Sequence, residues 1–218
     1  MAIVIKRTGD VHVNGIKCVV YGAAGCGKTV LCSTAPNPII ISAEGGLLSI
    51  AEKNLPYLEI NTLNDLNSAY NQLKKDSEYD TICVDSLSEI AERVIEQLKP
   101  EHKDPRKAYG EMADAMMVMI RKFRDLKGKN VVFTTKQEVK LDEATDTQLI
   151  QPILPGRILS TQLPYMVDEV FCMVVDRKGR HLQTSSDRQR QCKDRSGKLD
   201  AKEEPNLSSI FDKIKGNS

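Results

Sequence analysis

The sequence predicts an α/β protein with a mostly parallel sheet and helices on both faces. Short apolar, β-branched runs alternate along the chain with segments whose apolar residues recur at helical spacing. This alternation is typical of parallel strands joined by crossover helices. The chain has 218 residues, of which 40% are hydrophobic and 28% charged, enough to bury a sizeable core. We therefore expect a single domain over residues 1–218.

Four strands and three helices are expected between residues 16 and 135. The strands are the runs IKCVVY (16–21), NPIIISAE (37–44), YDTICVDS (79–86) and NVVFTT (130–135). A helix is expected to start at 28–34, a second to cover 62–75, and a third to follow residue 86 and end near 98. A polar, proline-containing break is expected at 99–107.

A methionine-rich segment before the fourth strand predicts one more helix. Its apolar face consists of Met112, Met116, Met119, Ile120 and Phe123. Met fills irregular gaps in protein interiors, so we interpret this stripe as part of the core and not as a set of ligands.

The last third of the chain has a different pattern. The segment 138–157 is polar with little periodicity, so we expect a long loop. Residues 166–176 and 180–184 are expected to form a β-hairpin turned by RKGR (177–180), and 206–215 a short amphipathic helix.

Composition narrows the classes of function and location. The formal net charge is only +1, so attraction to nucleic acid or membrane must come from local patches. No apolar stretch approaches the roughly 18 residues of a membrane span, and MAIVIKRTGD is too short in its apolar part for a secretory signal. Six cysteines without a CxxC pair argue against a zinc site and favour a reducing, cytoplasmic location.

The stretch GAAGCGKT (22–29) matches the phosphate-binding pattern G-x-x-x-x-G-K-[ST]. Glycines let backbone amides surround phosphate oxygens, the lysine reaches the terminal phosphates, and the threonine hydroxyl binds Mg²⁺. A second interpretation is a plain glycine turn, but the expected strand before and helix after are the context that the motif requires. We expect a nucleotide to contact Gly22, Ala23, Ala24, Gly25, Cys26, Gly27, Lys28, Thr29 and Val30.

Asp85 ends the apolar strand TICVD, where a carboxylate is placed to hold Mg²⁺ together with Thr29. The alternative is that Asp85 or Ser86 caps the following helix. Both roles can coexist in one loop.

Two further polar residues follow expected strands. Glu44 comes just after IIIS, and ligands gather at the carboxyl ends of parallel strands, so Glu44 is a candidate base for the attacking water. Gln137 follows VVFTT and is a candidate sensor of the γ-phosphate. The alternative for Glu44 is a solvated carboxylate in a loop. The alternative for Gln137 is an ordinary polar residue at the end of a strand.

In their order, GAAGCGKT, SAEGG (42–46), TICVDS (81–86), VVFTTKQ (131–137) and QCKDRSGKL (191–199) resemble a RecA-type ATPase core. More closely, the chain resembles small phage nucleotide-binding proteins of the AAA group that act as RecA-like single-strand annealing proteins, over residues 16–214. The resemblance implies a RecA-like fold, ATP and Mg²⁺ as ligands, and single-stranded DNA as partner. It also implies a ring or filament of identical subunits, a single-strand-binding protein as a candidate partner, annealing or strand exchange in phage recombination, and the cytoplasm of a bacterial host.

KDRSG (193–197) is similar to the Lys-Asn-Arg-Phe-Gly element of RadA-type recombinases, whose basic residues reach a neighbouring subunit's ATP site. The resemblance implies that Lys193 and Arg195 act in trans. Asp194 and Ser196 depart from the pattern. The alternative is ordinary surface charges in a basic hairpin.

The resemblance also implies that 138–157 contacts single-stranded DNA. That segment is not basic, since it holds Lys140 and Arg157 but four acidic residues. Residues 101–107 and 177–198 are more basic alternatives. Aromatic residues make up only 5% of the chain, so base stacking on an aromatic platform is not expected.

Three other functions stay open at this point. TKQE (135–138) is close to the [NT]KxD guanine-reading pattern of GTPases. A small-molecule kinase would need an arginine-bearing lid, for which Arg157 is a candidate. A third alternative is an oligomer that ATP orders with negligible turnover.

Overall fold

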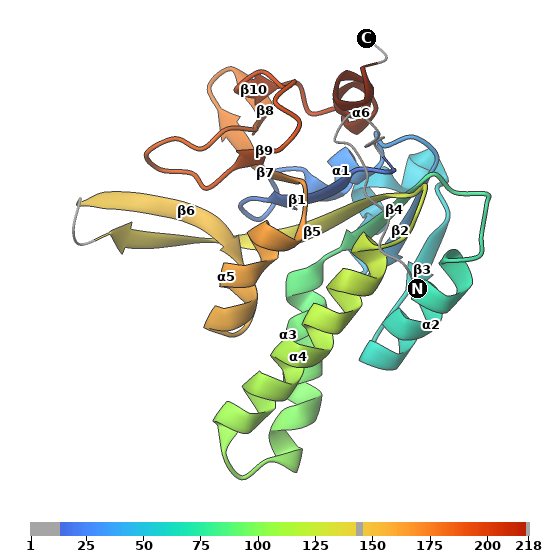
Figure 1. Ribbon diagram of the computed structural model, residues 1–218, viewed down its shortest axis with the longest axis vertical. Coiled ribbons are helices and arrows are strands. Elements are labelled where there is room, and N and C mark those ends of the chain that lie inside the picture. The colour runs from blue at the N-terminus through green and yellow to red at the C-terminus, as the bar shows by residue number, and fades with distance from the viewer. Residues whose placement is uncertain (1–13, 143–145, 217–218) are drawn as a thin grey trace, which may run out of the picture.

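The computed structural model describes residues 14–142 and 146–216 and has an α/β architecture (Figure 1). The strands are β1 (Lys17–Tyr21), β2 (Pro38–Ser42), β3 (Tyr57–Glu59), β4 (Thr81–Asp85), β5 (Asn130–Asp142), β6 (Thr147–Ile153), β7 (Glu169–Asp176), β8 (Gly179–Gln183), β9 (Lys193–Asp194) and β10 (Lys202–Glu203). The α-helices are α1 (Lys28–Cys32), α2 (Leu63–Leu73), α3 (Leu87–Leu98), α4 (Pro105–Arg124), α5 (Arg157–Met166) and α6 (Leu207–Lys215). Two 3₁₀ helices are η2 (Leu47–Lys53) and η3 (Lys99–Glu101).

The sheet has the order β10-β8-β7-β1-β5-β4-β2-β3. The strands from β7 to β3 run parallel, while β8 and β10 continue the sheet in antiparallel fashion. Because Tyr21 pairs with Thr135 and Ser42 with Asp85, the carboxyl ends of the central strands lie along one edge. The predicted mostly parallel sheet is confirmed, and its four expected strands are β1, β2, β4 and the first part of β5.

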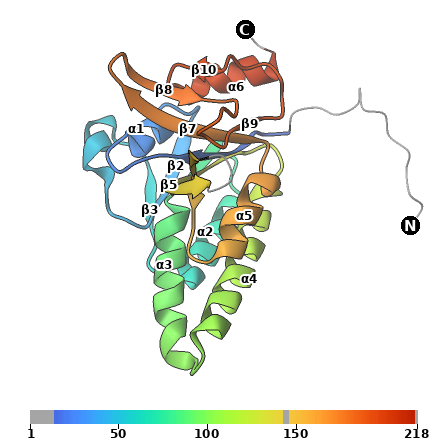
Figure 2. The ribbon, with the colours of Figure 1, turned by 90° about the vertical axis from the view of Figure 1, so that its left-hand side faces the viewer.

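Helices cover both faces of the sheet, as predicted (Figure 2). Along β1, Val19 belongs to one buried cluster and Cys18 and Val20 to the other, which is the alternation expected of a strand buried on both faces. One cluster packs against α2, α3, α4 and α5, and the other against α1, η2 and α6. The methionine stripe of α4 is buried in the first cluster, which confirms that it forms core.

Polar side chains fix where the helices begin. Thr62 caps α2 in a reciprocal pair with Asp65, Ser86 caps α3, and Asn206 caps α6. The break expected at 99–107 is shorter than predicted, because Asp104 accepts from the backbone of Arg106 and α4 starts at Pro105. Proline suits this first helical position, where its missing N–H costs nothing.

The long loop predicted at 138–157 is wrong. β5 continues to Asp142, and β6 returns beside it as an antiparallel ribbon in which Gln137 pairs with Pro152 (Figure 1). Residues 143–145 lie outside the described part. The side chains of Val139 and Leu141 are more than half exposed, so the ribbon stands clear of the core and lacks the burial pattern by which a strand is recognised.

The hairpin and terminal helix predicted near the end of the chain are confirmed as β7–β8 and α6. Helix α5 and the short strands β3, β9 and β10 were not predicted. The expectation about the first ten residues lies outside the described part. In residues 14–142 and 146–216, every helix is too short or too polar to span a bilayer.

Candidate functional site

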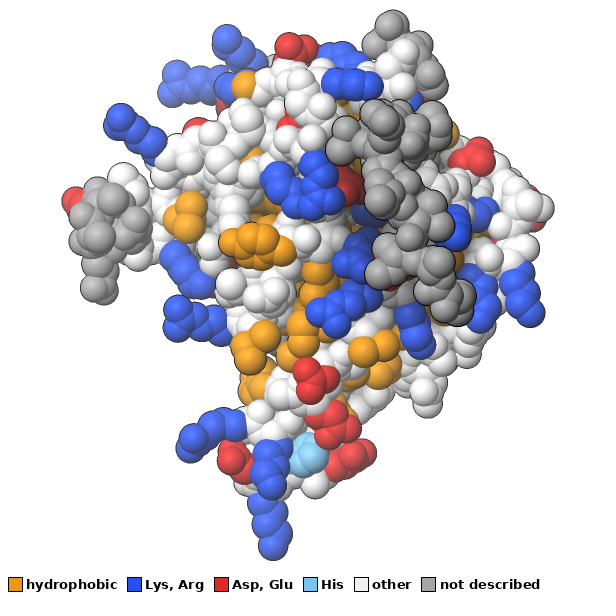
Figure 3. All heavy atoms as spheres, in the orientation of Figure 1, with side chains coloured by type: hydrophobic (Ala, Val, Ile, Leu, Met, Phe, Trp, Pro, Cys, Tyr) orange, Lys and Arg blue, Asp and Glu red, His pale blue; other side chains and the backbone are white. Residues whose placement is uncertain are grey.

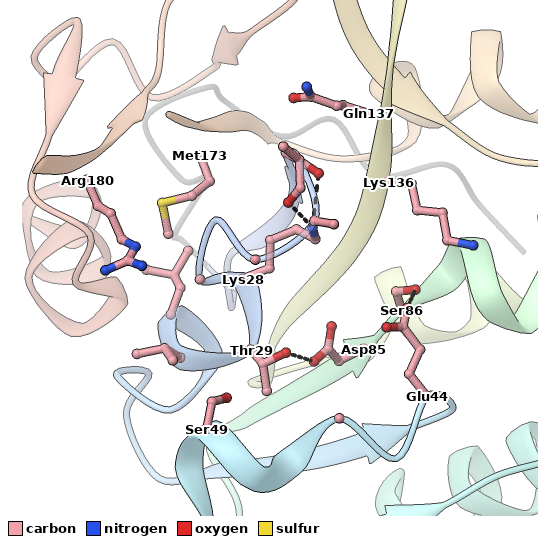
Figure 4. A pocket seen from close by; sticks show the side chains of 18 of the residues that line it. Lys28, Thr29, Glu44, Ser49, Asp85, Ser86, Lys136, Gln137, Met173 and Arg180 are labelled. Atoms are coloured by element: carbon pink, nitrogen blue, oxygen red, sulfur yellow. Dashed lines mark hydrogen bonds between the residues drawn. The ribbon is translucent and has the colours of Figure 1, made fainter. Parts of the chain in front are cut away.

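The phosphate-binding loop connects β1 to α1 and lines a cavity of about 680 Å³ at the carboxyl edge of the sheet (Figure 4). Two glycines are required by the backbone. A Cβ at Gly22 would lie 2.7 Å from Cys26 Sγ and 2.9 Å from the Met173 carbonyl oxygen. Gly27 has a φ of 107°, which side chains rarely adopt. The loop therefore has the tight curl that its sequence predicts.

Lys28 lies over this curl. Its Nζ donates to the carbonyl oxygens of Gly22 and Ala23, each at 3.0 Å. The two oxygens hold the ammonium at the mouth of the loop, where negative charge of a bound phosphate would be attracted to it. The role of Lys28 at the terminal phosphates stays a prediction.

Thr29 and Asp85 meet at the floor of the cavity. Thr29 Oγ1 donates to Asp85 Oδ2 at 2.6 Å, and Thr134 Oγ1 donates to Asp85 Oδ1 at 2.5 Å. Hydroxyl and carboxylate oxygens are the ligands that Mg²⁺ prefers, usually one or two from the protein beside phosphate oxygens and water. This oxygen pair therefore suits Mg²⁺ bound together with a phosphate. The described residues contain no cluster of three or more His, Cys, Asp or Glu side chains that could hold a metal ion.

The helix-capping role, which was the alternative for Asp85, is filled by the next residue, Ser86. Ser86 is the N-cap of α3, where its side chain accepts from the Glu89 amide at 3.3 Å. Asp85 is thus not the N-cap and keeps both carboxylate oxygens on the hydroxyls of Thr29 and Thr134.

Glu44 faces the same cavity from the end of β2. The Ser86 hydroxyl donates to Glu44 Oε1 at 2.5 Å, and Arg93 on α3 donates to the carbonyl of Ala43, the preceding residue. Its carboxylate is therefore held by Ser86, the backbone beside it is held by Arg93, and the carboxylate lies across the cavity from the phosphate-binding loop (Figure 4).

Gln137 and Lys136 line the cavity from β5, where the strand leaves the sheet for the ribbon. Lys136 was not predicted. Its Nζ contacts both carboxylate oxygens of Glu92 at 2.7 Å and lies 3.6 Å from Glu89. The structure thus brings a glutamine and an ion-paired lysine to the lining of the cavity.

Arg180, Met173 and Pro205, together with Leu31 and Ser49, also line the cavity and were not predicted as site residues. Arg180 Nε donates to the Cys26 carbonyl oxygen at 3.0 Å, although the two residues are 154 positions apart. No local pattern singles out such a contact, since it depends on β8 lying two strands from β1.

Lys193 and Arg195 lie away from this cavity. β9 pairs with the first residues of β7, Glu169 and Val170, so both cations lie at the amino edge of the parallel strands, opposite the phosphate-binding loop. Lys193 Nζ donates to the carbonyl oxygens of Pro164 at 2.6 Å and Val167 at 2.5 Å. Arg195 pairs with Asp168 at 2.6 Å. They cannot serve their own chain's loop, so any role at an ATP site concerns a neighbour.

The surroundings of these cations hold two unusual ionisable groups. Burial and the nearby negative charge of Asp194 raise the pKa of Glu169 to about 8. Burial lowers the pKa of Lys17 to about 8, where its Nζ donates to the carbonyls of Leu126 and Lys129. Burial also lowers the pKa of Lys193.

Of the residues named for the GTPase and kinase alternatives, Lys136 and Gln137 line the cavity, whereas Glu138 and Arg157 are not among its described lining residues. TKQE lies in β5, with Lys136 bound to α3 and Glu138 accepting from Gln151 and paired with Lys140. Arg157 is the first residue of α5 and is absent from the described residues that line the cavity.

Comparison with known proteins agrees with this geometry. A family model described as an AAA domain matches residues 14–196, a range that contains the loop, Glu44, Asp85 and Gln137. A comparison with curated protein sequences gives no match. The family assignment indicates nucleotide binding and hydrolysis by a P-loop domain. With a match over most of its length and a glycine loop, lysine, threonine and aspartate in place, the chain belongs to the AAA domain family of P-loop NTPases.

Proposed function

We propose that this protein is a Mg²⁺-dependent ATPase of RecA type that assembles head to tail, binds single-stranded DNA, and promotes annealing or strand exchange in phage-type recombination. The observation that carries the ATPase part is the meeting of Thr29 and Asp85 below the loop that holds Lys28. DNA, assembly and recombination come from the resemblance to phage annealing proteins.

Each lining residue has a part in hydrolysis under this proposal. The loop amides and Lys28 hold the triphosphate, and Thr29 and Asp85 hold Mg²⁺, which when bound neutralises charge on the phosphate oxygens. Glu44 accepts the proton of the attacking water, oriented by Ser86. Gln137 hydrogen-bonds the terminal phosphate.

The head-to-tail assembly is supported by the opposite positions of loop and cations. The phosphate-binding loop lies at one edge of the parallel strands, and Lys193 and Arg195 lie at the other. Such a heterologous contact repeats from subunit to subunit and gives a ring or a filament. In it, the Arg195 guanidinium of one subunit would offset the charge that develops on its neighbour's γ-phosphate.

The β5–β6 ribbon is the element through which DNA would act on the ATP site. Gln137 lies in its first strand and lines the cavity, while Val139 and Leu141 are exposed further out. The ribbon therefore connects solvent-exposed side chains to the γ-phosphate side of the site.

The more basic segments 101–107 and 177–198 are weaker candidates for contacting DNA. In Figure 3 the far end of the α3–α4 hairpin shows acidic side chains among the basic ones, and His102 contacts Glu111 there at 2.8 Å. Within 177–198, Arg190 lies 3.3 Å from Asp187 and Arg195 is paired with Asp168. These contacts engage Arg190 and Arg195 of the second segment within the chain.

The test is the rate of ATP hydrolysis with and without single-stranded DNA, measured across protein concentration. We expect a rate per subunit that rises with concentration as subunits assemble, and further stimulation by DNA that weakens as salt increases. A rate that depends on neither concentration nor DNA would contradict the assembly and the DNA partner. ATP binding without any turnover would instead leave an ATP-ordered oligomer.

A further inference from the structure

We propose that Arg180 holds the nucleoside of the bound nucleotide by laying its guanidinium plane against the base, with Pro205 as the apolar neighbour. The inference rests on the proposed function, because it takes the triphosphate to lie at Lys28. It assigns a residue to the part of the ligand that the phosphate-binding motif does not contact.

The pleat of β8 directs Arg180 toward the loop. Successive side chains of a strand point to opposite faces, so Arg180 and Leu182 share one face. Leu182 is buried with Leu31 of α1, which places that face on the side of the phosphate-binding loop. His181, between them, points the other way and lies 3.6 Å from Asp176.

Pro205 lines the same cavity as Arg180. β10 runs antiparallel to β8, with Lys202 beside Gln183 and Glu203 beside Leu182. Pro205 follows the end of β10 by two residues. The cavity is thus lined by an apolar ring as well as by a planar cation.

Arg180 is fixed over the loop by one of its five N–H groups. Nε donates to the Cys26 carbonyl oxygen at 3.0 Å, and a Cβ on Gly27 would lie 3.4 Å from that nitrogen. The structure shows no other hydrogen bond or ion pair of Arg180 within residues 14–142 and 146–216. Its plane and terminal nitrogens therefore remain available to a ligand.

The direction of the triphosphate decides which part of the ligand Arg180 meets. Glu44 and Asp85 lie on one side of Lys28, and Arg180 lies on the other (Figure 4). The γ-phosphate must face Glu44 for water to attack it, so the nucleoside extends toward Arg180. A cavity of about 680 Å³ is within the usual range for small-molecule ligands.

A guanidinium can bind a phosphate or stack on a base, and the direction of the triphosphate brings the base to Arg180. A guanidinium is planar and weakly hydrated, so it stacks on aromatic rings, whereas a lysine ammonium offers only a point charge. A guanidinium on an aromatic face contributes about 0.5–2 kcal/mol, which corresponds to roughly 2- to 30-fold in affinity.

The experiment compares a ligand that has a base with one that has none. Dissociation constants for a non-hydrolysable ATP analogue and for inorganic tripolyphosphate, both with Mg²⁺, are measured by calorimetry. For Arg180→Ala we expect affinity for the analogue to fall about 10-fold and affinity for tripolyphosphate to stay within about 2-fold. Arg180→Lys keeps the charge but not the plane, so the same selective loss is expected.

Arg177→Ala is the matched control, because Arg177 lies in the turn of the same hairpin and outside the cavity. It should bind both ligands as the unaltered protein does. If Arg180→Ala does not fold, Arg180→Lys supplies the measurement. Equal loss for both ligands, no loss for either, or full affinity in Arg180→Lys would overturn the inference.

The proposed function fails in a different way. Lys28→Ala that still bound tripolyphosphate at full strength would contradict the phosphate site itself. Unaltered protein that bound tripolyphosphate as tightly as the analogue would leave the phosphate site intact and remove only the role of Arg180.

Discussion

Ser86 donates its hydroxyl to Glu44 Oε1 at 2.5 Å, and this contact joins the ends of two neighbouring parallel strands. Ser86 also caps α3, so the carboxylate of Glu44 is positioned by the same residue that starts a helix of the core. The proposed base is thereby anchored to the interior of the protein.

Glu44→Gln should leave ATP binding intact and lower hydrolysis by about 10²- to 10⁴-fold, because the amide cannot accept the proton of the attacking water. Single-turnover hydrolysis beside nucleotide binding is the measurement. Loss of binding together with turnover would mean that Glu44 serves structure and not chemistry.

Ser86→Ala should slow turnover by about 10-fold, because Glu44 loses its orienting hydrogen bond. It also loses a helix cap, worth about 1 kcal/mol, so Asp104→Ala, which uncaps α4 and leaves Glu44 untouched, is the control. Ser86→Thr keeps the hydroxyl and should restore turnover. If the Asp104 variant is slowed equally, the orienting role is wrong.

Lys28→Ala should weaken binding of the triphosphate by about 100-fold, since charge-assisted contacts to phosphate are lost. Titration with the Mg²⁺ complex of a non-hydrolysable analogue measures this. Lys53→Ala, an exposed lysine at the end of η2, should bind normally.

Lys193→Ala and Arg195→Ala should keep ATP binding and lose DNA-stimulated hydrolysis, because both residues are proposed to act on a neighbour. Arg195→Ala is the cleaner variant, since Lys193 also binds two backbone carbonyls of its own chain. Stimulated turnover at the normal rate in both variants would remove the trans role.

Mixing two inactive variants tests the trans role more directly. In equal mixtures of Lys28→Ala and Arg195→Ala, about a quarter of the sites combine an intact loop from one subunit with an intact arginine from the next. Activity should therefore return on mixing. If Arg195 acts within its own chain, no mixture regains activity.

Two buried groups predict how stability depends on pH. Glu169 has its pKa raised from 4.5 to about 8, so between these values the unfolded chain loses its proton first and stability falls as pH rises. Lys17 has its pKa lowered from 10.5 to about 8, so in that upper window the unfolded chain binds more protons and stability rises with pH. These two contributions together place a minimum in the free energy of unfolding near pH 8.

Glu169→Gln isolates the first contribution. One pKa unit corresponds to about 1.4 kcal/mol, so removing the titration should flatten the lower branch by on the order of a few kcal/mol. The free energy of unfolding by urea at pH 5 and at pH 7.5 is the measurement. An equal decline in the variant and the unaltered protein would show that Glu169 does not cause it.

The sequence predicts those parts of the site whose residues can be recognised from the residues next to them in the chain. The phosphate-binding loop is one continuous stretch, and Asp85 and Glu44 each follow a buried strand, so a parallel sheet necessarily brings them to one edge. Local pattern and site geometry coincide for these residues.

Residues that reach the site across the sheet could not be predicted in this way. Arg180 is brought to Cys26 only by the order of β8, β7 and β1, and Lys136 is oriented by its contact with Glu92 on α3. The sequence around each of these two residues looks the same as that around an ordinary exposed lysine or arginine. The ribbon was missed for a related reason, since a strand pair outside the core is not constrained to alternate buried and exposed residues.

β5 runs without interruption from the middle of the sheet to the outer part of the ribbon. Its inner half is held on both sides, by β1 and β4, and its outer half only by β6. Gln137 lies at the point on β5 where pairing with β1 and β4 gives way to pairing with β6. Under the proposed function, a strand bound to DNA at its outer half and a strand that meets the terminal phosphate at Gln137 are therefore one continuous strand.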